Sequence, residues 1–363
     1  MLPAIAGRIP LVRRPKAPAL PLAERLTHLT ELTVPPADAS HHDLVARASG
    51  VLNYAALIAS DVGMPDLAAR LCWRQHRVFA EAGALSQDIA VMSLMPLINI
   101  SRLLTREGDG DGAYDVLVRL YRAAQQRGTA TIRNHNVDIA ALTRTEEDHR
   151  KICQELWVSL LIDGDRALAR SGHWTKAAQA MTAHRGVGNR LLDGRQILIM
   201  SLMERGLDQQ ALDTIDSTTP TEPWENAIAT LLRLSCRPGP TPHAELDLAL
   251  QEALALLTPP DPATAAFHTR VALAALDLAR DRTSPSVAPL HNAVVDAATH
   301  DAYAARDVLN HPPTRPHLTS EQIHQLDTVL TASGLGAGNL PPAHAQALTT
   351  AVNQAGTTLR GLL

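Results

Sequence analysis

Two pairs of arginines have a spacing suited to binding an anion. Arg102 and Arg106 are four residues apart, and so are Arg166 and Arg170. Residues at i and i+4 of a helix lie on one face, so each pair presents two guanidinium groups in the same direction. A guanidinium group binds a carboxylate or phosphate through two parallel hydrogen bonds. The pattern therefore favours an anion-binding surface. The alternative is that the arginines are solvated or neutralised by nearby acids: Glu107, Asp163 and Asp165.

A second set of side chains is a candidate for catalysis. It consists of one histidine, one carboxylate and two arginines: His135, Asp163, Arg166 and Arg190. No nucleophile elbow, Walker loop, paired-cysteine or zinc-protease motif supports an enzyme, and the histidines lack a metal-ligand spacing. We therefore expect no metal and no cofactor, and the sequence leans against catalysis.

These residues lie in a part of the chain that repeats itself. Residues 154–187 align with residues 187–220 at a shift of 34. Each copy contains a glycine followed five positions later by an alanine, and the same step occurs twice upstream. A glycine that ends one helix in a left-handed cap, followed by a small residue where the next helix packs closely, predicts a helical hairpin. The four steps are Gly63/Ala68, Gly108/Ala113, Gly172/Ala177 and Gly206/Ala211.

A period of 34 is that of the tetratricopeptide repeat, and residues 40–220 resemble that family. Most of the family's aromatic positions are missing here. The resemblance implies a concave groove lined by the first helix of each hairpin. By position relative to each turn glycine, it places both arginine pairs on that groove. It adds Asn53, Asp193 and Gln196 as further ligand-facing residues.

The predicted fold is all-α, a right-handed solenoid of helical hairpins with one small β-hairpin. Residues 129–141 contain β-branched residues around a turn-prone Asn-His-Asn, which predicts two short strands. We divide the chain into a proline-rich lead with one short helix (1–37), repeat-like hairpins interrupted by an insertion at 127–142 (38–220), and degenerate helical repeats with a C-terminal cap (221–363). The lead carries Arg8, Arg13, Arg14 and Lys16, and we expect a solvated, partly disordered tail.

Composition limits the class of protein. The net charge is −4, which gives no bulk attraction to nucleic acid or to an anionic membrane. No apolar run is long enough for a membrane span, and no signal peptide is evident. The three cysteines are far apart and predict reduced thiols of a cytoplasmic protein. Abundant Ala, Arg and Pro with only three Lys indicate a GC-rich bacterial genome such as an actinobacterial one.

The leading functional hypothesis is a cytoplasmic helical-repeat adaptor that binds a peptide or protein segment with carboxylate or acidic groups in an arginine-lined groove. One alternative is an enzyme or accessory subunit of a bacterial peptide-modifying, natural-product pathway. Its site would lie between the insertion and the third and fourth repeats. Another is a sensor that resembles the repeat half of actinobacterial regulators without their DNA-binding head and acts through a partner. The sequence leaves the oligomeric state open, homo-oligomers included.

Overall fold

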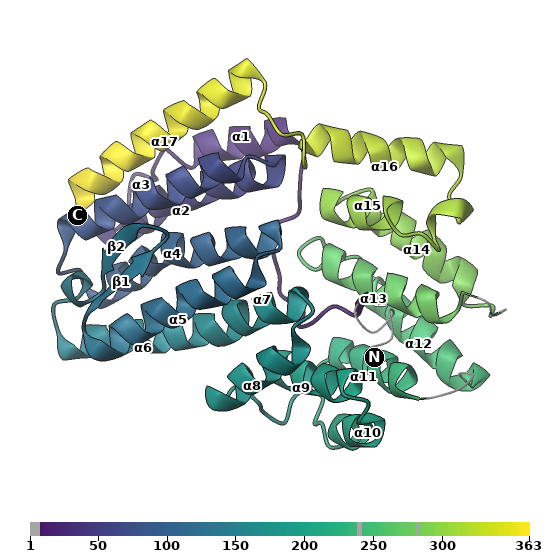
Figure 1. Ribbon diagram of the computed structural model, residues 1–363. Coiled ribbons are helices and arrows are strands. Elements are labelled where there is room, and N and C mark those ends of the chain that lie inside the picture. Colours follow the sequence, from purple (N-terminus) through teal and green to yellow (C-terminus); the bar gives the residue numbers. More distant parts are fainter. Residues whose placement is uncertain (1–7, 238–241, 281, 283) are drawn as a thin grey trace. The chain divides into compact units, whose positions relative to one another are not determined.

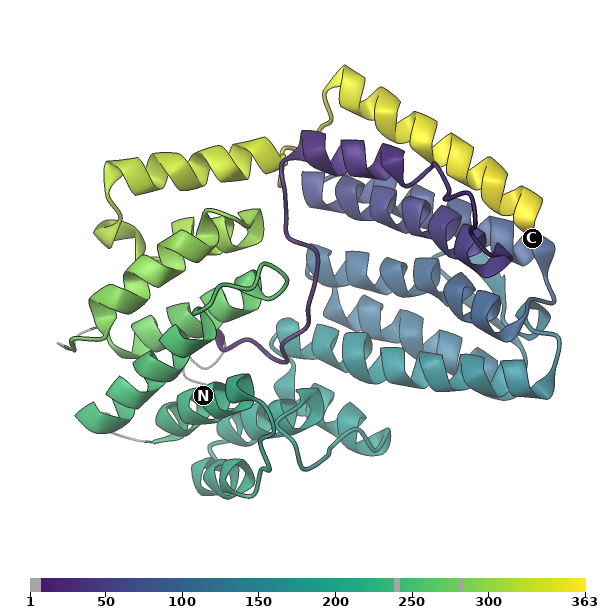
Figure 2. The same ribbon diagram turned by 180° about the vertical axis from the view of Figure 1, so that it is seen from behind.

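The computed structural model describes residues 8–237, 242–280, 282 and 284–363. The chain is mostly helical, with 71% helix and 3% strand, and consecutive helices pack against their neighbours (Figures 1 and 2). This arrangement is compatible with a helical-repeat solenoid. The residues group into two units: unit 1 contains residues 1–21 and 174–333, and unit 2 contains residues 22–173 and 334–363. The expected segments 1–37, 38–220 and 221–363 describe the repeat pattern of the sequence and stay predictions.

The four glycine–alanine steps form the turns that the sequence predicts. All four glycines have positive φ, with values of 88° at Gly63, 88° at Gly108, 81° at Gly172 and 72° at Gly206. Only glycine adopts this conformation without strain, so each helix ends where its glycine stands. The alanine that follows each turn has no exposed surface: Ala68, Ala113, Ala177 and Ala211.

Unit 2 is built from helical hairpins and the small sheet. Helices α2 and α3 pair, as do α4 and α5, and α6 continues through a π-helical turn into α7. The elements of this unit are α1 (Leu22–Glu31), α2 (His41–Val62), α3 (Pro65–Ala82), α4 (Gln87–Glu107), α5 (Gly110–Gln126), β1 (Thr129–Ile132), β2 (His135–Asp138), η2 (Ala140–Leu142), α6 (Glu146–Ser159), η3 (Leu160–Gly164), α7 (Asp165–Arg170) and α17 (Pro342–Leu362).

The predicted β-hairpin is confirmed. Strands β1 and β2 are antiparallel, with Ile132 opposite His135 across the turn. Val137 and Ile139 are fully buried, so the hairpin covers apolar surface of unit 2. The backbone N–H of Leu85 donates to the carbonyl of Leu142 at 2.8 Å, which ties the end of the insertion to the loop before α4.

The C-terminal helix α17 packs against the first hairpin. It lies along α1 and α2 and also touches α3, although α3 ends at Ala82 and α17 begins only at Pro342 (Figure 2). The loop before it is anchored on the end of α2, because the amides of Gly336 and Gly338 donate to the carbonyls of Asp61 and Val62 at 2.8 and 2.7 Å. The apolar spacing of 342–362 predicts a helix there but does not indicate this partner.

Unit 1 repeats one packing pattern. Helices α9, α11, α13 and α15 each pack on the helix that follows, and α13 also packs on α11 and α15. The elements of this unit are α8 (Trp174–Ala183), α9 (Asp193–Glu204), α10 (Asp208–Asp216), α11 (Pro223–Cys236), α12 (His243–Leu256), α13 (Ala265–Leu278), α14 (Val287–Ala298), α15 (Ala302–Leu309), η4 (Arg315–His317) and α16 (Ser320–Ser333).

The expectation of a solvated N-terminal tail is wrong for residues 8–21. This stretch, called the tail below, belongs to unit 1, and Ile9 and Leu11 are only 6% and 7% exposed. The expected short helix of the lead is present as α1. Proline-rich composition correctly indicates the absence of regular structure at 13–21. The composition does not reveal that this segment packs against the helices of unit 1.

Helix α4 is the one described helix that is long and apolar enough to cross a membrane, and 56% of its apolar window is buried inside the protein. Burial of this kind is typical of a core helix in a soluble protein. The three cysteines are free thiols, and burial raises the pKa of Cys72 and of Cys236 to about 12. At neutral pH these two thiols are therefore protonated and poorly reactive.

Candidate functional site

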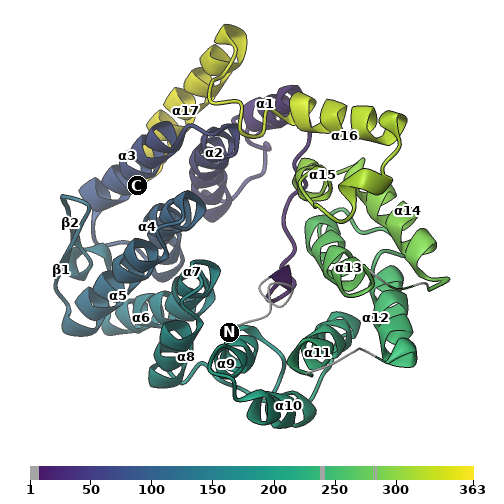
Figure 3. The same ribbon diagram turned by 45° about the vertical axis from the view of Figure 1, so that its right-hand side comes forward.

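The tail runs along the first helices of the hairpins in unit 1. Figure 3 shows it passing inside the arc made by α9, α11, α13 and α15. Its contacts reach all four of these helices or the residues that immediately precede them. We call the surface that these helices present to the tail the A-helix face. The described part of the N-terminus is thus held like an extended peptide on a repeat surface.

At one end of the tail, Arg8 binds a buried carboxylate. Its Nη1 donates to both oxygens of Asp277, in the last turn of α13, at 3.0 and 2.9 Å. The Asp277 side chain is 4% exposed, and the Nε2 of His311 also lies 3.2 Å from it. Burial alone would raise the pKa of Asp277, but hydrogen bonds from His311 and Arg8 hold it below the usual value. Asp277 is therefore an anion in need of cationic partners.

Arg13 and Arg14 bind acids at two helix starts. Arg13 donates to Glu222, which precedes α11, at 2.5 Å, and Arg14 donates to Asp193, the first residue of α9. The positive end of a helix dipole favours an acid at both positions. Glu222 also accepts from Arg190 at 3.2 Å, so two guanidinium groups share it. The acids at these two helix starts therefore point negative charge at the tail.

Further along, the tail is held by its main chain as well. The amide of Lys16 donates to the carbonyl of Ala263 at 2.9 Å, and its ammonium lies 3.1 Å from the ring centre of Tyr303. The amide of Ala19 donates to Asp301 at 3.1 Å, and the amide of Ala302 donates to the carbonyl of Ala19 at 3.3 Å. Main-chain hydrogen bonds recognise the extended shape of a segment rather than its sequence.

The prolines of the tail suit it to this position. Pro10, Pro15 and Pro18 have no amide N–H, so they leave no donor to be satisfied on the A-helix face. Proline also restricts the unbound chain to extended conformations, which lowers the entropic cost of binding. Ile9, Leu11 and Ala19 add apolar contact, because each is less than a tenth exposed.

The positive charge of Arg13 in the tail affects the pKa of a buried histidine on α13, His268. His268 is 6% exposed, and its pKa is lowered to about 4. Burial is the main cause, and the nearby positive charge of Arg13 lowers the pKa further, while Asp261 opposes both. His268 is therefore neutral at physiological pH, and its ionisation is coupled to the presence of the tail.

The structure places two of the predicted groove arginines in ion pairs within unit 2. Arg102 donates to both oxygens of Asp163 at 3.1 and 2.9 Å. Arg106 donates to Asp61 at 2.8 Å, and the buried Arg25 binds the same carboxylate at 2.7 Å. Two of the four guanidinium groups are thus paired with acids. Asp163 is one of the acids that the sequence suggests for this role, and Asp61 is not.

The other predicted ligand-facing residues are divided between the units. Asn53 lies in unit 2, where it accepts from Asn99 at 3.3 Å, and Arg166 and Arg170 lie on α7 of the same unit. Asp193 and Gln196 lie on α9 of unit 1. Gln196 is 1% exposed and donates to the carbonyl of Leu191 at 2.9 Å, so its role is internal. Asp193 is the predicted residue that does contact an extended segment, and that segment is cationic.

Three of the four candidate catalytic residues, His135, Asp163 and Arg190, have different partners. His135 stacks on Trp73, with ring centres 3.9 Å apart. Asp163 binds Arg102, as described above, and Arg190 binds Glu222 and the buried Glu225 of unit 1. Among the described residues, no group of three His, Cys, Asp or Glu side chains could hold a metal ion.

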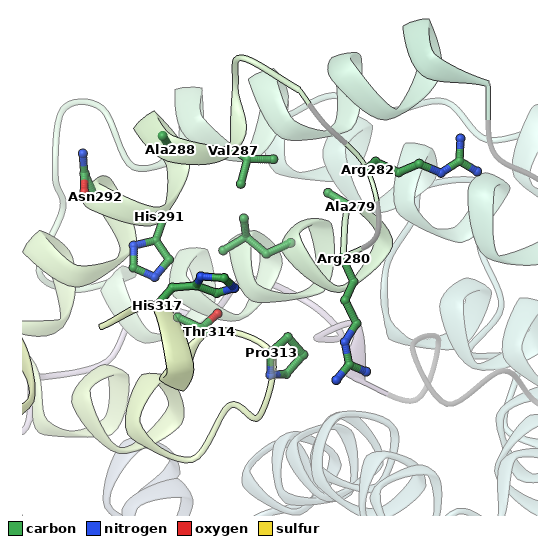
Figure 4. A pocket seen from close by; sticks show the side chains of 11 residues that line it. Ala279, Arg280, Arg282, Val287, Ala288, His291, Asn292, Pro313, Thr314 and His317 are labelled. Carbon is green, nitrogen blue, oxygen red and sulfur yellow. The ribbon is translucent and has the colours of Figure 1, made fainter. Parts of the chain in front are cut away.

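A cavity of about 380 Å³ in unit 1 lies among α13, α14 and the η4 region. Figure 4 shows His291 and His317 side by side, while the side chains of Arg280 and Arg282 extend away from them. Burial lowers the pKa of His291. Because the cationic and imidazole groups do not converge on one point, this cavity assigns no ligand.

Reasoning from the sequence missed the tail as part of a site. The available signal was the mixture of residues in 8–21: apolar Ile9, Leu11 and Val12 alternate with prolines and with four basic residues, and there is no acid. A solvated linker is usually poor in apolar residues, so this composition indicates a segment that packs against a surface. The acids that meet the tail, Asp193, Glu222 and Asp277, were not recognisable as a set, because the three come from separate repeats.

Comparisons with known proteins identify no relative. No protein-family model matches the chain, and neither a curated protein nor a solved structure matches it.

Proposed function

We propose that this chain is a helical-repeat adaptor whose A-helix face binds an extended polypeptide segment. The observation that carries the proposal is the tail itself, which lies on four successive first helices through ion pairs, main-chain hydrogen bonds and buried apolar residues. A surface that already holds one extended segment has the shape and polarity to hold another. The protein acts by binding, in a bacterial cytoplasm, within a regulatory or biosynthetic complex.

The architecture that suits this function is a right-handed, tetratricopeptide-like solenoid. Two features of the chain support it: the left-handed glycine turns followed by buried alanines, and the pairwise packing of α9 to α16. In such an array the first helices of successive repeats lie side by side and form a continuous surface. An extended peptide then contacts several repeats at once.

The anionic partner expected for an arginine-lined groove has less support. Arg102 and Arg106 are paired with Asp163 and Asp61, so an acidic ligand would have to displace these carboxylates. The acids that meet the tail favour the opposite charge in the ligand. The accessory-enzyme and sensor hypotheses stay predictions, and no contact described above favours either one.

The proposal is tested by selecting ligands on the full-length protein. A library of random extended peptides is panned against a variant whose tail is weakened by Arg8→Gln, Arg13→Gln and Arg14→Gln. Selected peptides are then measured on the same chain carrying in addition Tyr303→Ala or Glu222→Gln. Binding that falls at least tenfold on either of these variants supports the A-helix face as the site.

A matched control removes a comparable tyrosine from unit 2. Tyr121→Ala should leave the affinity of the selected peptides unchanged. The proposed function would be contradicted if the selected peptides bound the Tyr303→Ala, Glu222→Gln and Tyr121→Ala proteins equally well. It would also be contradicted if the library yielded no binder.

A further inference from the structure

We propose that the tail is an internal ligand, which occupies the A-helix face in place of a cationic, proline-containing segment of a partner protein. Partner and tail then compete for one surface. This inference rests on the proposed function and adds to it the chemistry of the partner and a built-in control of access.

The A-helix face presents acids to a ligand that has none. The first 21 residues contain four basic residues and no Asp or Glu. Three of these cations meet Asp193, Glu222 and Asp277, each from a different repeat. An acidic or neutral segment in this place would leave those carboxylates with fewer counter-charges, which is costly where they are buried. The face is therefore matched to a basic segment.

Arginine and imidazole groups that belong to the unit itself do not remove this preference. Arg190 pairs with Glu222 and Glu225, and His311 lies beside Asp277. His268 stays neutral because its pKa is lowered to about 4. Without the tail, Asp193 would lose the guanidinium of Arg14, and Asp277 would lose that of Arg8 and keep the imidazole of His311 at 3.2 Å. Both of these side chains are a tenth exposed or less, so water replaces the lost cations poorly.

The contacts of the tail are of a kind that a partner can replace. The side chains of Arg8, Arg13 and Arg14 are 47%, 32% and 32% exposed, and partly exposed ion pairs contribute little each. Residues 13–21 form no helix or strand that would have to unfold first. The tail competes mainly because it is tethered, which gives it an effective concentration of about millimolar order. A partner segment with several matching cations can bind tightly enough to displace the tail.

The test measures binding of a fluorescent peptide with the sequence of residues 8–21 to three full-length proteins. They are the wild type, the tail variant Arg8→Gln/Arg13→Gln/Arg14→Gln, and a control of equal net charge, Arg70→Gln/Arg119→Gln/Arg360→Gln, changed in unit 2. A second peptide carries Gln at the three arginine positions. Fluorescence anisotropy is recorded at low and high salt, and circular dichroism checks that all three proteins are folded.

We expect the basic peptide to bind the tail variant at least tenfold more tightly than the wild type or the control protein. Its affinity should fall with salt, and the glutamine peptide should bind at least tenfold more weakly. Equal binding of the basic peptide to all three proteins would overturn the competition. Equal binding of the two peptides to the tail variant would overturn the cationic preference.

Failure of this inference can be told apart from failure of the proposed function. If library peptides bind the A-helix face but the tail peptide does not, the function stands and the internal-ligand proposal falls. If neither binds, both fall. Should the triple variant unfold, the single variant Arg13→Gln replaces it, because the Arg13–Glu222 pair is part-exposed on both sides and its loss leaves Asp277 and Asp193 with their partners.

Discussion

Acid should destabilise unit 1 in part by protonating the buried His268. Its ring is buried at the start of α13, beside Phe267 and with Nδ1 3.4 Å from the hydroxyl of Thr264. The folded protein lowers its pKa from 6.5 to about 4, through burial first and the charge of Arg13 second. Between these two values the unfolded chain binds a proton that the folded chain does not.

The sign and size of the effect follow from this difference. A folded pKa below the unfolded pKa gives stability that is complete above pH 6.5 and is lost as the pH falls toward 4. At 1.36 kcal/mol for each pKa unit, the whole loss is about 3 kcal/mol, and about 2 kcal/mol of it is reached at pH 5. Arg13→Gln removes a neighbouring positive charge, so it should raise the pKa of His268 and reduce this loss.

The assay is urea unfolding at pH 7 and pH 5, combined with NMR titration of the histidine rings. His268→Gln should reduce the fall in the free energy of unfolding by about 2 kcal/mol between these two conditions. His76 of unit 2 is the matched control: it is equally buried and its pKa is also lowered to about 4, by burial first and by His135 rather than Arg13 second. Arg13→Gln should leave the titration of His76 unchanged. An unaltered pH dependence in His268→Gln, or a His268 pKa near 6.5 in the wild type, would refute the reasoning.

Three further predictions concern stability. Ala177→Leu and Ala211→Leu should each cost about 1–3 kcal/mol, because both alanines have no exposed surface; unchanged melting temperatures would show that the repeat register is wrong. Asp61→Asn should cost about 3–5 kcal/mol in denaturant unfolding, since it leaves the buried Arg25 without its carboxylate, and a neutral effect would contradict the buried pair. Arg102→Gln breaks only a part-exposed pair and should change stability by less than about 1 kcal/mol in the same assay, so a larger loss would mean that this arginine is part of the core.

The local features of the fold were predictable because they depend on neighbouring residues. A glycine that ends a helix needs a left-handed conformation, and this requirement is visible in the spacing of Gly172 and Gly206 from the alanines that follow. The β-hairpin is visible for the same reason, since β-branched residues flank a turn within about a dozen positions. In contrast, the packing of α17 on α2 depends on contacts across almost the whole chain.

The site was less predictable, because complementary charges that are distant in sequence leave no local pattern. Arg102 and Arg106 form a clear pair along one helix, yet the acids that bind them come from other elements. Nothing in the sequence around Asp61 indicates that it pairs with Arg106. Likewise, Arg8 and Asp277 are separated by 269 positions. A basic, proline-rich N-terminus looks the same in sequence whether it is solvated or bound. The deciding property is the charge of a surface assembled from several repeats.

The most direct measurement of the central claim is site-specific photo-crosslinking from position 11 of the full-length protein. Leu11 is 7% exposed and is replaced by a photoreactive benzoyl-phenylalanine, and the crosslinked peptides are mapped by mass spectrometry. We expect crosslinks within one molecule to the A-helix face, and their yield should fall as the peptide of residues 8–21 is added. Crosslinks scattered over the chain, or a yield that saturating peptide leaves unchanged, would contradict the account of the tail as a displaceable internal ligand.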